Sequence, residues 1–241
     1  MTAARRALIT GSTSNIGLAI AERLARDGYV PTLNYAHDAQ RADRALAAVR
    51  RFCRDAALIR ADVTRESDVK RMVDEATADG PVGLLINNVG SFLWKPLLDT
   101  TLDEWNGSLS SNLTSAFLCC RAILPTMRSQ GEGQIINIAS MHAQSLRATP
   151  NTLPYAIAKA GVILLTKTLA KTEGRHGVRV NAVSPGFVDT GENLPPDAAL
   201  KVPLGRIATT AEIAAVVSFL ASKQAAYVTG SVLDIHGGAL L

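Results

Sequence analysis

The sequence predicts an α/β fold with one doubly wound sheet of seven parallel strands, in a single domain that spans residues 1–241. Short apolar runs alternate with segments of helical length along the whole chain. Most of these runs are continuously apolar, which is typical of strands that helices cover on both faces. No linker, low-complexity tract or internal repeat interrupts the alternation. Repeated β–α–β units of this kind fold with right-handed crossovers.

The elements follow one another in a regular order. The predicted strands lie at residues 7–10, 30–35, 57–60, 82–87, 134–139, 178–184 and 232–235. The predicted helices cover residues 16–27, 39–53, 66–79, 102–128, 153–173 and 211–222. Gly28 occupies the position of a glycine that ends a helix, and Thr152 followed by Pro154 marks a helix start.

One stretch, residues 189–202, has no clear element and carries Pro195 and Pro196. In a doubly wound fold a loop of this length is typical of a lid over a ligand. Residues 189–202 are therefore the predicted substrate loop. The alternative is an idle surface loop.

Composition excludes several classes of protein. Hydrophobic residues make up 47% of the chain, and Lys and Arg exceed Asp and Glu by only 25 to 21, without a run of like charges. This pattern predicts no nucleic-acid partner and no membrane contact. The three cysteines, at 53, 119 and 120, have neither a disulfide nor a zinc spacing, so no metal site is expected. With no signal-peptide pattern, a reducing, cytoplasmic location is predicted.

The first predicted strand runs directly into a helix through a turn rich in glycine and hydroxyl residues. Gly11 and Gly17 are six residues apart, and Thr13 and Ser14 lie between them. At this junction the free N–H groups and the dipole of the helix favour an anion, so the turn is a candidate pyrophosphate site. The alternative is a tight turn with no ligand.

Tyr155 and Lys159 are one helical turn apart at the start of a predicted helix, and so they share a face. A cation there stabilises tyrosinate and brings the phenol towards a pKa useful in proton transfer. Such a pair is commonly only a solvated helix edge. Ser140, however, lies at the carboxyl end of the strand 134–139, where ligands bind in this architecture.

With these residues in place, the whole chain resembles the compact form of the short-chain dehydrogenases/reductases, which have a Rossmann-type fold. The motifs lie in order and at matching spacings. They are Thr10-Gly11 with Asn15-Ile16-Gly17, Asp62-Val63, Asn87-Asn88-Val89-Gly90, the set Asn112, Ser140, Tyr155 and Lys159, the segment Asn181 to Thr190, and His236-Gly237-Gly238.

The resemblance implies a role for each catalytic residue. Tyr155 is the general acid/base, Lys159 lowers its pKa and binds the nicotinamide ribose, Ser140 polarises the carbonyl, and Asn112 holds a water that links Lys159 to solvent. The implied cofactor is NADP or NAD. The residues expected to bind it are Gly11, Thr13, Ser14, Asn15, Ile16, Gly17, Tyr35, Asp62, Val63, Asn88, Gly90, Tyr155, Lys159, Pro185, Gly186, Val188 and Thr190.

Two residues depart from the family pattern. Asn15 replaces the middle glycine of the turn; asparagine tolerates a positive φ, so the turn is expected to keep its shape. Val89 replaces an alanine and adds two methyl groups beside the expected adenosine ribose.

Cofactor choice depends on the end of the second predicted strand. Proteins that prefer NAD place an acid there, which accepts from the ribose hydroxyls and repels a 2′-phosphate. In this chain Tyr35 fills that position, with His37 and Arg41 close by, so NADP is favoured. Ser14, where a basic residue is usual, weakens this inference.

The resulting prediction is an NAD(P)-dependent oxidoreductase that interconverts a small ketone or 3-oxo compound and a secondary alcohol. Within the family, the sequence is most similar to 3-oxoacyl-carrier-protein reductases. The resemblance also implies a homotetramer or homodimer packed through residues 102–128 and 153–173. One alternative is a catalytically silent dinucleotide-binding regulator. Another, a nucleotide-sugar epimerase or dehydratase, normally requires a substantial C-terminal substrate domain.

Overall fold

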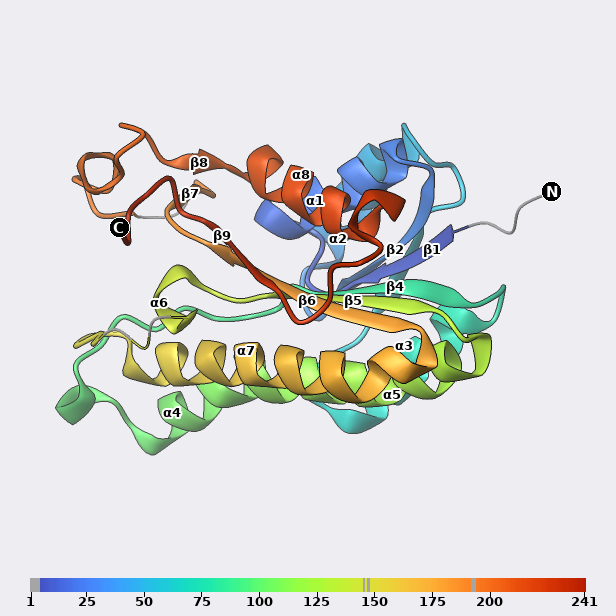
Figure 1. Cartoon of the computed structure of the whole chain (residues 1–241), viewed down its shortest axis with the longest axis horizontal. Helices are drawn as coiled ribbons and strands as arrows, with labels where there is room; N and C mark the ends of the chain where they lie inside the picture. The colour runs from blue at the N-terminus through green and yellow to red at the C-terminus, as the bar shows by residue number, and fades with distance from the viewer. Residues whose placement is uncertain (1–4, 145, 147, 192–193) are drawn as a thin grey trace.

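The computed structural model describes residues 5–144, 146, 148–191 and 194–241 and contains one central parallel sheet (Figure 1). Its order is β3-β2-β1-β4-β5-β6-β9. The strands are β1 (Arg5–Ile9), β2 (Tyr29–Tyr35), β3 (Ala57–Arg60), β4 (Val82–Asn87), β5 (Gly133–Ile138), β6 (Val178–Pro185) and β9 (Val232–Ile235). The predicted seven-stranded, doubly wound sheet is thus confirmed. The strand order reverses direction between β1 and β4, the point where such sheets bind ligands.

Helices cover both faces of the sheet, as Figure 1 shows. One layer contains α1 (Asn15–Arg26), α2 (Ala39–Arg50) and α8 (Thr210–Ala221). The other contains α3 (Glu66–Thr77), α4 (Leu102–Leu109), α5 (Ser115–Gln130) and α7 (Leu153–Glu173). Each layer has its own apolar core, with Ile20, Leu24 and Val217 in the first and Met72, Ile123 and Met127 in the second.

Three features differ from the sequence prediction. The helix predicted over 102–128 is interrupted by a π-helical segment, η2 (Ser110–Thr114). A four-residue helix, α6 (Met141–Gln144), follows β5. Two short strands, β7 (Val188–Asp189) and β8 (Ala208–Thr209), form a second parallel sheet that brackets the predicted substrate loop. Within that loop, Ala199–Lys201 forms a 3-10 turn, η4.

Helix α7, taken with the turn that follows it to His176, is long and apolar enough by composition to cross a membrane, with a mean hydropathy of 1.3. In this fold it packs against β6. Its buried residues Val162 and Ile163 belong to a third apolar cluster with Ala139 and Ala182. Part of the apolar character of α7 therefore serves its packing on the sheet, and 39% of its apolar window is buried.

Helix α1 approaches the turn before it so closely that Gly17 has no room for a side chain. A Cβ on Gly17 would lie 2.4 Å from the Gly11 carbonyl oxygen and 2.6 Å from Asn88 Nδ2. Because one of these neighbours is backbone, it cannot move aside cheaply. This contact fixes the distance between the helix and the strand ends.

We expect Gly17→Ala to lower the free energy of unfolding by about 1–3 kcal/mol, because the added methyl group overpacks a rigid contact. Gly107 in α4 is the matched control, since a Cβ there meets nothing within 4 Å. Gly107→Ala is expected to stabilise the protein by up to about 1 kcal/mol through helix propensity alone. Urea unfolding measures both; equal effects of the two substitutions would contradict the packing argument.

Candidate active site

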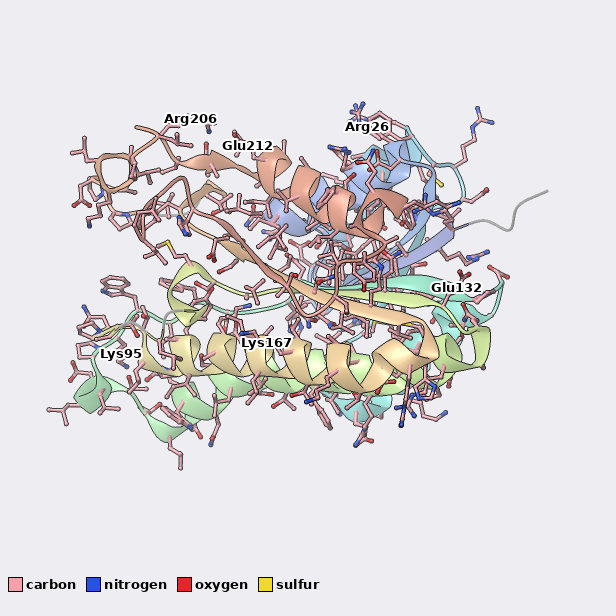
Figure 2. The ribbon with its side chains drawn as sticks, viewed as in Figure 1. Arg26, Lys95, Glu132, Lys167, Arg206 and Glu212 are labelled. Atoms are coloured by element: carbon pink, nitrogen blue, oxygen red, sulfur yellow. The ribbon has the colours of Figure 1, made fainter. Side chains whose placement is uncertain are left out.

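The residues singled out in the sequence gather at the carboxyl edge of the sheet. In Figure 1 this edge lies on the left, where α6, β7 and β8 are found and where α7 begins. The turn after β1, the segment after β4, Ser140 after β5 and the segment after β6 all leave the sheet here. Lys95, labelled in Figure 2, lies at the same edge, whereas Glu132 lies at the opposite one.

Ser140, which follows β5, lies close enough to Tyr155, in the first turn of α7, to influence its phenol. Burial raises the pKa of the Tyr155 phenol, and the neighbouring Ser140 hydroxyl lowers it by less. The pKa of Tyr155 is therefore raised in this structure, whereas sequence reasoning expected Lys159 to lower it. The reason lies in the position of the lysine.

Lys159 is buried, with 4% of its surface exposed. Its Nζ donates a hydrogen bond of 2.8 Å to the carbonyl oxygen of Ile138 and lies 5.7 Å from the centre of the Tyr155 ring. The ammonium is thus next to the phenol but directed at the backbone of β5. Burial lowers the pKa of Lys159 to about 8. Near neutral pH the site therefore holds a cation that is costly to keep charged.

Asn112 lies in the π-helical segment and is 1% exposed. Its Nδ2 donates to the carbonyl oxygens of Ser91 at 2.9 Å and Ser108 at 3.0 Å. Its Oδ1 is buried and accepts from none of the described residues. This oxygen and Lys159 Nζ both border Gly90, where a Cβ would lie 2.2 Å from one and 3.1 Å from the other. A buried acceptor beside a buried ammonium is a suitable place for a bound water.

The turn after β1 has the conformation expected of an anion-binding site. Gly11 has φ +57° and Asn15 has φ +49°, so Asn15 adopts the glycine-like conformation that its residue type predicted. Ser14 precedes α1 without a side-chain cap bond. Thr13 is half-buried in the turn, and Ile16 packs its side chain into the apolar layer behind it.

Asn34, at the end of β2, fixes this turn and was missed as a site residue in the sequence. Its Oδ1 accepts from the Gly11 N–H at 3.2 Å, and its Nδ2 donates to the Ala61 carbonyl at 2.9 Å. The Asn34 N–H donates to Ser12 Oγ at 3.0 Å. A polar residue inside an otherwise apolar buried strand was the available signal, because a buried amide must find hydrogen-bond partners.

Asn88 and Val89 hold the turn from the other side. Asn88 Nδ2 donates to the carbonyl oxygens of Thr10 at 3.1 Å and Gly11 at 2.9 Å. Val89 Cγ2 lies 2.8 Å from the position of a Cβ on Gly11. The larger residue at 89 therefore packs against the glycine turn, while Gly90 allows the backbone to pass close to Asn112.

Asp62 and Val63 follow β3, as predicted, and border a second region. Asp62 Oδ1 accepts from the Thr64 N–H at 3.0 Å and Thr64 Oγ1 at 2.7 Å. Burial raises the pKa of Asp62, but these hydrogen bonds and the charges of His37 and Arg65 together lower it by more. The pKa of Asp62 therefore lies below its usual value. Val63 is buried in the core.

Next to Asp62 is a pocket of about 330 Å³. Its lining includes His37, Arg60 and Arg65. Tyr35, the last residue of β2, is half-buried and precedes this lining directly. Arg41 is not among the lining residues and forms an ion pair of 3.4 Å with Asp38. The arginines that line the pocket are thus Arg60, Arg65 and Arg71, which sequence reasoning did not select.

The segment after β6 completes the site. Pro185 ends β6 and Val188 begins β7, whereas Gly186 and Thr190 are half-buried beside them. A Cβ on Gly186 would lie 2.8 Å from His236 Cα and 3.4 Å from Met141 Sδ. The chain can pass between the C-terminal strand and the residue after Ser140 only because position 186 is glycine.

Comparison with known proteins agrees with this geometry. A sequence model of the family described as enoyl-(acyl carrier protein) reductase matches residues 11–239. A 3-oxoacyl-[acyl-carrier-protein] reductase of Synechocystis is 37% identical, with 99% of this chain and 98% of that protein aligned. A 3beta-hydroxysteroid dehydrogenase of Eggerthella lenta is 34% identical, over 97% of this chain and 93% of that protein.

A solved structure of a short chain dehydrogenase from Bacillus anthracis superposes with a TM-score of 0.90 at 31% identity, covering 98% of this chain and 97% of that one. The family match and the relatives span nearly the whole sequence, and the fold is the same throughout. The chain therefore belongs to the short-chain dehydrogenase/reductase family and is an NAD(P)-dependent oxidoreductase that interconverts ketones and secondary alcohols.

Proposed function

We propose that Tyr155 is the proton donor and acceptor of this reaction, assisted by Ser140, Lys159 and Asn112. The observation that carries the proposal is the position of Ser140 and of the buried Lys159 ammonium, which both lie beside the Tyr155 side chain. Two neighbouring hydroxyl groups can both contact one substrate oxygen. A catalytically silent regulator would have no need to keep a buried, uncompensated lysine next to them.

The residues supply the following steps in the direction of reduction. Ser140 Oγ donates a hydrogen bond to the ketone oxygen, and Tyr155 Oη transfers its proton to that oxygen as negative charge develops there. When bound, the nicotinamide cofactor supplies the hydride to the carbonyl carbon. Lys159 stabilises the tyrosinate that remains, and a water on Asn112 Oδ1 connects the site with solvent. The reverse direction uses the same groups in the opposite order.

The residues present fit a dinucleotide. The turn with positive φ at Gly11 and Asn15 leads into an uncapped helix N-terminus, which suits a pyrophosphate. Lys159, whose Nζ borders Gly90 beside Asn112 Oδ1, would hold the ribose of the nicotinamide. Asp62 and Val63 would hold the adenine, and Pro185, Gly186, Val188 and Thr190 would border the nicotinamide.

NADP is the preferred cofactor in this proposal. The pocket after β2 and β3 is lined by Ala36, by four basic side chains, those of His37, Arg60, Arg65 and Arg71, and by the carboxylates of Asp62 and Asp68. Tyr35 leaves no carboxylate at the end of β2 itself. Arg60 uses its Nε on the Ala36 carbonyl at 3.2 Å, which holds the guanidinium at this pocket. A guanidinium is well suited to a phosphate, and the 2′-phosphate is the group that distinguishes NADP from NAD.

We assign the substrate loop to residues 189–202, of which 192 and 193 lie outside the described residues. The backbone pairing of β7 with β8 fixes its base, since Val188 pairs with Ala208 and Asp189 with Thr209. Ala198 and Val202 are buried, and a Cβ on Gly237 would lie 2.6 Å from Val202 Cγ1. The C-terminal segment thus packs against the loop at Val202. This support suits a loop that closes over a small ligand.

A homotetramer or homodimer and a cytoplasmic location complete the proposal. The faces of α5 and α7 leave large apolar side chains in solvent, with Phe117 43%, Ile157 42% and Leu164 67% exposed. Burying them between copies of the chain would lower the free energy of the assembly.

We expect Tyr155→Phe to reduce kcat roughly 10²–10⁴-fold, the usual loss when a general acid is removed. Cofactor binding, followed by calorimetry, is expected to remain. Tyr227→Phe is the matched control because Tyr227 is fully exposed. A Tyr155→Phe enzyme with near-parental turnover would exclude the proposed proton donor.

Lys159→Met is expected to abolish activity and to stabilise the cofactor-free protein. The folded-state pKa of Lys159, about 8, lies below the usual value of 10.5. Below pH 8 both states carry the proton, and the full cost of burying the cation, up to about 3 kcal/mol, is present. Between these two pKa values the unfolded state binds more protons, so the parent gains stability as the pH rises.

Urea unfolding at several pH values tests this prediction. The advantage of Lys159→Met over the parent should be largest below pH 8 and shrink above it. Lys167→Met, on the exposed side of the same helix (Figure 2), should show no such pH dependence. A Lys159→Met protein that is less stable than the parent at neutral pH would contradict the assignment of a costly buried charge.

Arg60→Ala is expected to weaken NADP(H) binding about tenfold and to leave NAD(H) binding nearly unchanged, because only the 2′-phosphate loses a partner. Tyr35→Asp should shift the ratio of kcat/KM values further towards NAD(H) by repelling that phosphate. Arg44→Ala, an exposed cation outside the pocket, is the control. If the parent already prefers NAD(H) strongly, the pocket has another role.

A further inference from the structure

The segment that follows Gly90 places two aromatic rings, those of Phe92 and Trp94, next to the proposed proton donor, Tyr155. The Phe92 ring meets the Tyr155 ring edge to face, with centroids 5.0 Å apart and an angle of 81°. The Trp94 ring follows at 6.2 Å from Phe92, tilted by 43°. The Phe92 ring therefore lies in contact with the Tyr155 ring on one side and next to the Trp94 ring on the other. We call Phe92 and Trp94 the aromatic wall.

The aromatic wall is exposed to solvent. Phe92 is 61% exposed and Trp94 64%. Neither belongs to the three apolar clusters that form the core of the described residues. Aromatic residues make up only 5% of the sequence. Large rings left in water next to a site are typical of a surface that binds a ligand.

The wall is held in place through Lys95, the residue that follows Trp94. The Lys95 N–H donates to the carbonyl oxygen of Asn151 at 2.6 Å, which ties the segment to the residues before α7. Lys95 Nζ lies 2.8 and 3.0 Å from the carboxylate oxygens of Glu104. Glu104 in turn belongs to the capping box of α4 with Thr101. A surface fixed in this way loses little conformational entropy when a ligand binds.

The same contacts set the charge of the wall. Lys95 is the one cation in segment 91–100, and its ammonium is paired with Glu104. The segment offers aromatic faces and aliphatic side chains, with no unpaired cation for an anionic substrate group. The segment therefore suits a part of the substrate that is uncharged and apolar.

We propose that the substrate is a neutral ketone whose carbonyl carbon lies within, or is bonded directly to, an aromatic or alicyclic ring, and that this ring packs against Phe92 and Trp94. The inference rests on the proposed role of Tyr155. A ketone oxygen within hydrogen-bond distance of Tyr155 Oη and Ser140 Oγ brings its nearest substituents alongside the neighbouring ring of Phe92. The product of reduction is the corresponding secondary alcohol.

A ring is favoured over an open chain for two reasons. Paired rings in edge-to-face or offset contact gain roughly two- to tenfold in binding beyond the area they bury. An open acyl chain must also lose rotational freedom along the wall, whereas a ring is already rigid. A flexible 3-oxoacyl substrate would bury apolar surface against the aromatic wall but would make no contact between rings.

The test compares two neutral methyl ketones of equal carbon number, acetophenone and 2-octanone, with the full-length enzyme and saturating cofactor. The parent should show a higher kcat/KM for acetophenone. Phe92→Leu and Trp94→Leu keep an apolar side chain but remove the ring. Each should lower the ratio of the two kcat/KM values about three- to tenfold. Tyr227→Leu, which removes a fully exposed ring elsewhere, should leave the ratio unchanged.

The ratio separates the wall from the chemistry. Phe92 contacts Tyr155, so its replacement can slow both reactions, but a common loss cancels in the ratio. Phe92→Tyr, which restores a ring, should restore the parental ratio. If the parent reduces 2-octanone and the ratios do not change in the leucine variants, the inference is wrong and the proposed function stands. If no open-chain or cyclic ketone is reduced with either cofactor, both are wrong.

Discussion

The hydrogen bond from the Lys159 ammonium to the Ile138 carbonyl is the interaction about which the site is arranged. It joins α7 to the carboxyl end of β5 and holds a cation in a place that water hardly reaches. The charge persists there because the apolar layers on both faces of the sheet contribute far more to stability than one ion costs. Tyr155 in α7 and Ser140 after β5 then take their positions from the two elements that this bond connects, whereas Asn112 reaches the site from η2.

Much of the fold follows from local sequence pattern. The strands at 57–60, 82–87 and 232–235 and the helix 153–173 begin and end as predicted, because buried parallel strands and helix-start residues leave clear signals. The interruption of the helix 102–128 at Ser110–Thr114 leaves no such signal. A π turn is set by what its side chains reach in space, here the Ser91 carbonyl contacted by Asn112, and not by helix propensity. The pairing of β7 with β8 is equally nonlocal.

The site residues likewise divide into those that the sequence predicts and those that it does not. Residues tied to a motif were predictable, and the structure brings Ser140, Tyr155, Lys159 and Asn112 together. Asn34 and Arg60 were not selected because their importance comes from neighbours on other strands: the Gly11 N–H for one and the pocket beside Asp62 for the other. Asn15 shows the opposite case. Its tolerance of a positive φ is a property of the residue itself, so its conformation could be deduced without a structure.

The π-helical segment also has a consequence for how this chain can vary. A single residue contributes about 100° of rotation to an α-helix. Segment Ser110–Thr114 takes up an extra residue between α4 and α5, so the two helices can each present their own face, α4 to α7 and α5 to β4. A one-residue deletion there would restore a regular repeat and turn one helix against the other. We therefore expect this protein to be more sensitive to a deletion or insertion within Ser110–Thr114 than to most substitutions around that segment.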